Sequence, residues 1–128
     1  MLESDLTAAE RERYGRQIGP GVLAPEGQLR LKRATVLVTR AGGMGGPAAL
    51  LLTMGGVGRV IIAHGGTMIS PDLNRQVLGS EDALGKLRAP EFAARLRSMN
   101  RFVEVEAVDH EPDDAEARDL ARRCDVIL

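Results

Sequence analysis

The sequence has a single cysteine and no long apolar run. One cysteine, Cys124, cannot form an internal disulfide or a zinc cluster, so we expect it to be a buried thiol. No uninterrupted apolar segment approaches the roughly 20 residues that a membrane-spanning helix requires. The N-terminal residues MLESDLTAAERER also lack the apolar centre of a secretory signal. These absences argue against a membrane protein and predict a cytoplasmic location.

An excess of charge of either sign is missing as well. The net charge of −1 gives no global reason to bind nucleic acid or an anionic membrane. At 128 residues and 44% apolar content, the chain is long enough for one domain with a buried core and too short for two ordinary ones. No Asp or Glu lies between Glu26 and Asp72, although five basic residues do: Arg30, Lys32, Arg33, Arg40 and Arg59.

The middle of the chain has the pattern of a βαβ unit. Residues Ala34–Thr39 and Arg59–Ala63 form short apolar runs typical of strands buried on both faces. Between them, Pro47–Met54 has a helical composition, with proline at its start and Gly55-Gly56 at its end. A strand, a helix and a strand in this order predict two neighbouring parallel strands joined by a right-handed crossover.

The flanking segments extend this pattern. A capping box, Thr7 to Glu10, and a helix begun by Pro25 predict an N-terminal helical arm over residues 1–33. Residues 34–128 then form the predicted α/β half-domain, which is Rossmann-like, with a mainly parallel sheet, helices on both faces and no helix after its last strand. Its later elements are expected as a helix over 89–100, a strand over 101–108, a helix over 113–123 and a strand over 124–128.

A glycine-rich turn follows the first strand of the pattern. Such turns bind phosphate because glycine lets the backbone approach closely and the next helix presents free N–H groups. Gly43-x-Gly45-x-x-Ala48 fits a dinucleotide fingerprint but starts several residues past the strand. We favour the register Arg40 to Gly45, in which Arg40 replaces the first glycine. A side chain there is expected to strain the backbone by about 1–3 kcal/mol or to change the turn.

Several motifs together resemble the ThiF/MoeB/HesA family of ubiquitin-activating-type adenylation domains, in its N-terminal half. These motifs are RYGRQIG, GQLRLKRATVLV leading into AGGMG, GGVGRVII, LNRQVL, LGKLRA and RSMN. The resemblance implies binding of Mg-ATP and attack on its α-phosphate by the C-terminal carboxylate of a ubiquitin-like or sulfur-carrier protein. It also implies a homodimer, or pairing with a homologous subunit.

The resemblance assigns roles to particular residues. Arg16 matches an arginine that reaches into the partner's site, and Arg75 matches a phosphate-contacting arginine in the molecule's own site. Three glycines match the turn, namely Gly42, Gly43 and Gly45. Arg88 stands where the family has a phosphate-contacting lysine, and it keeps the charge without the compact ammonium.

Other positions depart from the family pattern. His64 and Gly66 replace two aspartates, of which the first binds ribose hydroxyls, and Asp72 replaces an asparagine. With no acid between Glu26 and Asp72, we expect nothing nearby to take over the ribose contact. We read His64 as a structural residue at the cofactor site rather than as a metal ligand or base. The family's magnesium aspartate would fall beyond Leu128, so we assign no metal ligand.

These departures leave several functions open. We favour a degenerate or incomplete copy in which Arg40 does not rescue nucleotide binding and ATP turnover is weak or absent. One alternative is the N-terminal part of an active adenylyltransferase, and another is a structural dimer partner that lends Arg16. A dinucleotide-binding module ranks last, because the segment after the second strand has neither the acid typical of NAD sites nor the basic residue typical of NADP sites.

Overall fold

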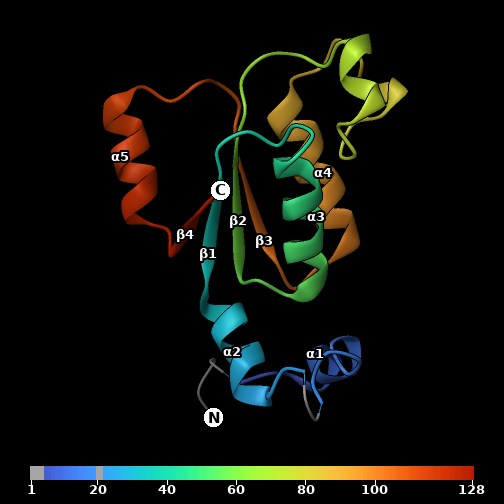
Figure 1. Ribbon diagram of the computed structural model, residues 1–128, viewed down its shortest axis with the longest axis vertical. Coiled ribbons are helices and arrows are strands. Elements are labelled where there is room, and N and C mark those ends of the chain that lie inside the picture. The colour runs from blue at the N-terminus through green and yellow to red at the C-terminus, as the bar shows by residue number, and fades with distance from the viewer. Residues whose placement is uncertain (1–4, 20–21) are drawn as a thin grey trace.

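The computed structural model describes residues 5–19 and 22–128, and a four-stranded parallel sheet lies at its centre (Figure 1). The spatial order of the strands is β3-β2-β1-β4. Each of the first two strands is buried from its second residue onward, as expected for apolar strands covered on both faces. The bounds are Thr35–Val38 (β1), Arg59–Ala63 (β2), Glu104–Val108 (β3) and Val126–Ile127 (β4).

The strand pairing confirms the predicted βαβ unit. β1 and β2 pair in parallel, with Val36 opposite Val60 and Val38 opposite Ile62. β3 continues the sheet beyond β2, and β4 pairs with the other edge of β1. The segments that leave the carboxyl ends of β1, β2 and β3 therefore emerge at the same edge of the sheet (Figure 1).

The helices lie on both faces of the sheet, which confirms the α/β, Rossmann-like fold class. In Figure 1, α3 and α4 cover one face and α5 covers the other. No helix in the described part of the chain is long and apolar enough to cross a bilayer. The helices are Ala8–Arg13 (α1), Pro25–Arg33 (α2), Gly45–Gly55 (α3), Arg88–Met99 (α4) and Asp114–Arg122 (α5), with two short 3-10 helices, Ser70–Asn74 (η1) and Glu81–Ala83 (η2).

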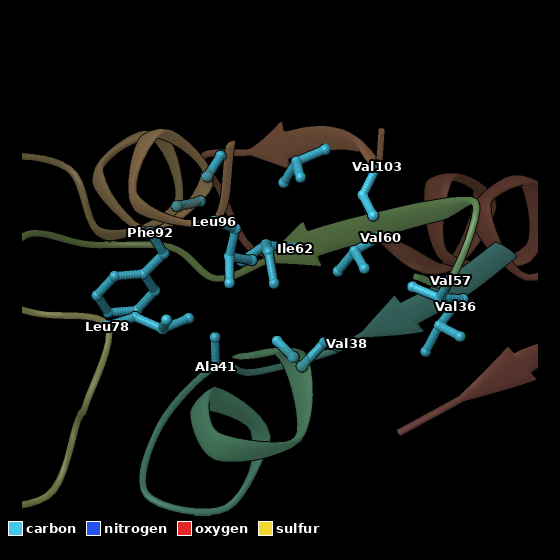
Figure 2. Close-up of a cluster of buried hydrophobic side chains, with 14 of the residues drawn as sticks. Val36, Val38, Ala41, Val57, Val60, Ile62, Leu78, Phe92, Leu96 and Val103 are labelled. Carbon is cyan, nitrogen blue, oxygen red and sulfur yellow. The ribbon is translucent and has the colours of Figure 1, made fainter. Parts of the chain in front are cut away.

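Alternation along the strands divides the apolar core between the two faces. Val38 and Ile62 point toward α3 and α4, where they pack with Phe92 in the larger cluster (Figure 2). Leu37 and Ile61 belong to a smaller cluster under α5. The sheet thus separates two apolar cores. Because both cores pack against it, the strands hold the loops at their carboxyl ends in place.

Cys124 departs from its predicted environment. It is partly buried, and its Sγ donates a 3.0 Å hydrogen bond to the carbonyl oxygen of Leu120. The expectation of a buried thiol is therefore wrong, because Cys124 lies two residues before the short edge strand β4, whose residues are exposed. Partial burial raises the pKa of this thiol.

Candidate functional site

The glycine-rich turn connects β1 to α3 at the carboxyl edge of the sheet. Gly45 is the first residue of α3, and a Cβ atom there would overlap the carbonyl oxygen of Arg40 and lie 3.0 Å from Cγ1 of Val38. Met44 occupies the N-cap position of α3 and makes no side-chain capping hydrogen bond. The turn therefore depends on glycine at position 45. The described side chains provide no cap for the start of α3. The Gly46 N–H donates to the Gly42 carbonyl at 2.9 Å, and Pro47 has no N–H.

Arg40 sits in this turn without backbone strain. Within residues 5–19 and 22–128, every residue with positive φ is a glycine, so Arg40 has an ordinary backbone conformation. Its side chain is exposed. Of the two expected outcomes, strain of about 1–3 kcal/mol from the left-handed region is therefore absent, and a change of the turn stays a prediction.

Arg75 lies against the turn, as the predicted site requires. A Cβ atom at Gly43 would lie 3.3 Å from both Cγ and Cδ of Arg75. The guanidinium of this exposed arginine donates from Nη1 to the Pro71 carbonyl at 2.9 Å and to Asn74 Oδ1 at 3.1 Å. The structure thus brings the turn and Arg75 together from separate parts of the chain.

Arg88 is held by internal partners. Its Nε and Nη2 donate to Asp72 Oδ2 at 3.1 and 2.8 Å, and its Nη1 donates to the Gly65 carbonyl at 3.1 Å. Asp72 also accepts from the Ile69 backbone and from Gln76. Burial alone raises the pKa of Asp72, but the Ile69 N–H and the Arg88 guanidinium outweigh it, so this pKa lies below its usual value. The two departures at positions 72 and 88 thus form one buried ion pair.

His64 lies inside the protein. It is 3% exposed, and its ring packs edge-on against Phe92 at 5.9 Å between centroids. Burial lowers the pKa of His64, and the positive charges of Arg88 and Arg40 lower it further, against the opposite influence of Glu111 and Asp72. Among the described residues, no hydrogen-bond partner reaches the buried Nδ1 of His64, so the hydrogen-bonded structural role expected for it stays a prediction.

Glu111 is a nearby acid that sequence reasoning missed. A Cβ atom at Gly65 would lie 3.0 Å from the backbone nitrogen of Glu111 and 3.3 Å from its Cγ. We expected no acid to replace the missing aspartate because no Asp or Glu lies close to β2 in the sequence. Glu111 follows β3, which is the neighbour of β2 in the sheet. Parallel pairing of these strands is the signal that identifies it.

The motif RYGRQ, residues 13–17, anchors the N-terminal arm to the end of α3. Gln17 Nε2 donates to the Gly55 carbonyl at 2.7 Å, and Asn100 Nδ2 donates to Tyr14 Oη at 2.8 Å. Arg13 Nη1 donates to Asn100 Oδ1 at 2.9 Å. Arg16 is the exposed arginine between these anchored residues.

This anchorage places the motif away from the turn of its own chain. The motif contacts the last residue of α3, whereas the turn adjoins the first, and a helix of 11 residues is about 16 Å long. The structure therefore brings together Gly42, Gly43, Gly45 and Arg75 but does not bring Arg16 to them. A role for Arg16 in a partner's site stays a prediction.

Strand order and turn together define the class of protein. A parallel sheet of order 3-2-1-4, with a glycine-rich turn after β1 and helices on both faces, is a Rossmann-like α/β fold of the kind that binds nucleotides at its carboxyl edge. The sequence profile of the ThiF family matches residues 14–128. The chain belongs to the ThiF family.

Individual relatives agree with this assignment. The vegetative HesA protein of Trichormus variabilis is 48% identical over 97% of this chain, which covers 47% of that protein. A sulfur carrier protein adenylyltransferase of Thermus thermophilus is 37% identical over 95% of the chain, which covers 45% of it. The crystal structure of selenomethionine PaaA superposes with a TM-score of 0.85 at 29% identity, covering 99% of this chain and 42% of that one. The chain thus spans less than half the length of these relatives.

Proposed function

We propose that the protein containing this chain activates the C-terminal carboxylate of a ubiquitin-like or sulfur-carrier protein by adenylation. The observation that carries this proposal is the placement of Arg75 against the glycine turn at the start of α3. Cationic side chains and helix N-terminal N–H groups are the donors that stabilise charge on a transferring phosphate. The name of the Thermus thermophilus relative gives the substrate class.

The proposed reaction is a displacement at phosphorus. A carboxylate oxygen of the carrier protein attacks the α-phosphorus of ATP and forms a new P–O bond. The bond from that phosphorus to the bridging oxygen breaks, and pyrophosphate leaves with the electron pair. Arg75 and the α3 N-terminus would hold the phosphate groups and stabilise the negative charge that develops on the leaving group.

Magnesium has no assigned ligand here. Among the residues that the structure describes, no three His, Cys, Asp or Glu side chains cluster in a way that could hold a metal ion. Weak or absent ATP turnover by this chain stays a prediction. The proposal of a degenerate site rests on the altered residues at positions 40, 64, 72 and 88. The expected lack of a nearby acid does not support it, because Glu111 lies beside Gly65.

The first test measures exchange of labelled pyrophosphate into ATP. The natural-length protein is assayed with the ubiquitin-like proteins encoded in the same genome. We expect exchange with at least one of them, and a fall of about 100-fold in Arg75→Ala, because a preorganised donor to a developing charge contributes on that scale. Arg122→Ala is the control, since Arg122 is exposed and, among the described residues, its one salt bridge is to Asp119 on α5. Equal activity in Arg75→Ala and Arg122→Ala would contradict the role of Arg75.

A second test addresses the proposed dimer and Arg16 together. Arg16→Ala and Arg75→Ala are each expected to be strongly impaired alone. If Arg16 acts in the partner's site, a mixed dimer contains one intact site, which has its own Arg75 and receives Arg16 from the other subunit. After dissociation and random reassociation in equal amounts, about a quarter of the wild-type activity should return. A mixture no more active than its components would rule out this exchange of arginines.

A further inference from the structure

We propose that Glu111 provides the carboxylate that binds the ribose hydroxyls of the nucleotide, in place of an acid directly after β2. The inference rests on the proposed nucleotide-binding function and adds a specificity-determining residue to that site. In Rossmann-like folds an acid that follows the second strand commonly accepts hydrogen bonds from the ribose. Here the residues at that point are His64, Gly65 and Gly66.

None of these three residues is suited to that contact. His64 is 3% exposed and packs into the core against Phe92. Gly65 and Gly66 have no side chains, and a Cβ atom at Gly66 would lie 2.7 Å from Arg88 Nη1. The carboxyl end of β2 therefore offers the ribose no carboxylate and no exposed side chain, since the unpartnered Nδ1 of His64 is buried, and an acidic acceptor has to come from another segment.

The segment after β3 supplies one. β2 and β3 pair in parallel with Ala63 opposite Val108, and the His64 N–H donates to the Val108 carbonyl at 3.2 Å. Both loops leave the same edge of the sheet (Figure 1). Glu111 lies so close to Gly65 that its Cγ would be 3.3 Å from a Cβ atom placed on that glycine. Its side chain thus lies beside the place where a side chain from the end of β2 would begin.

Neighbouring acids are engaged elsewhere. Asp72 is 5% exposed, and its oxygens accept from Ile69, Gln76 and Arg88. Asp109 and Glu116, which precede and follow Glu111 in the chain, both contact the ring of His110, at 3.3 and 2.9 Å.

Glu111 differs from these acids. It is exposed, and within residues 5–19 and 22–128 it forms no salt bridge. Its carboxylate remains available for a hydroxyl donor.

The experiment compares ATP with 2′,3′-dideoxy-ATP in the natural-length protein. Titration calorimetry with each nucleotide and magnesium gives a ratio of dissociation constants for every variant. We expect the wild type to bind ATP about tenfold more tightly, because hydrogen bonds to a charged acceptor have effects of this size. Glu111→Gln should bind both nucleotides with nearly equal affinity. Glu26→Gln, an exposed acid in the first turn of α2, should keep the wild-type ratio.

Each outcome has a defined meaning. A Glu111→Gln protein that still prefers ATP about tenfold would overturn the role of Glu111, as would a wild type that binds both nucleotides equally. In both cases the proposed nucleotide site would stand. A wild type that binds neither nucleotide would overturn the proposed function itself. Because each ratio is taken within one variant, a uniform loss of affinity or stability does not affect the comparison.

Discussion

Replacing Asp72 with alanine is expected to lower the free energy of unfolding by about 3–5 kcal/mol. The Asp72 and Arg88 side chains are 6% and 15% exposed, and they pair at 2.8 Å. Removing the carboxylate leaves the Arg88 charge largely buried without its partner, and it also removes the acceptor for the Ile69 and Gln76 N–H groups. Urea denaturation followed by circular dichroism measures the loss.

An exposed pair provides the matched control. Asp119 and Arg122 on α5 also meet at 2.9 Å, but their side chains are 73% and 74% exposed. Asp119→Ala should change the free energy of unfolding by less than about 1 kcal/mol, since solvent screens such pairs. If Asp72→Ala were no more destabilising than Asp119→Ala, the pair would not hold the loop between β2 and α4.

The same pair sets a pH dependence. Because the pKa of Asp72 is lowered in the folded protein, its stabilising effect is present above its ordinary pKa of 3.8 and is lost as the pH falls through the lower folded-state value. The difference in stability between wild type and Asp72→Ala should therefore be constant near neutral pH and shrink in acid.

Alanine at position 45 is expected to be the most disruptive change in the glycine turn. Its Cβ would overlap the Arg40 carbonyl oxygen, which belongs to the backbone and cannot rotate away. Overpacking at a rigid position costs about 3 kcal/mol. Thermal and urea unfolding should both show this loss in Gly45→Ala, and nucleotide binding should fall with it because the start of α3 has to move.

Gly42→Ala is the control from the same turn. No heavy atom lies within 4 Å of a Cβ atom placed on Gly42, and its φ is not positive. This variant should retain stability within about 1 kcal/mol of the wild type. Two equally destabilising variants would indicate that the turn has a different conformation from the one described.

Much of the fold could be predicted from local patterns in the sequence. β2 was predicted with its observed bounds, Arg59–Ala63, because a buried parallel strand reads as a short apolar run. The capping box at Thr7 and Glu10 is present, since it needs only residues three apart. Helix α3 begins at Gly45 rather than at Pro47, because the turn closes directly into its first residue.

The candidate site was less predictable because its members come from distant segments. Arg75 and the glycines could be assigned from motifs, and the structure brings them together. Arg88 was expected to face phosphate, but its pairing with Asp72 depends on a loop whose path the sequence does not reveal. Glu111 was missed because it lies far from Gly65 in the chain and adjoins it only through the pairing of β2 with β3.

The uncapped start of α3 links ligand binding to the stability of the domain. An isolated helix of 11 residues is marginal in water, and α3 contains Gly45, Gly46 and Gly55 without a side-chain cap. A phosphate group at its N-terminus would supply the acceptor that the Met44 side chain does not. A ligand that binds only the native state raises the melting temperature as its concentration exceeds its dissociation constant. A purified sample that retains a nucleotide should therefore melt at a higher temperature than the same sample after the nucleotide is removed.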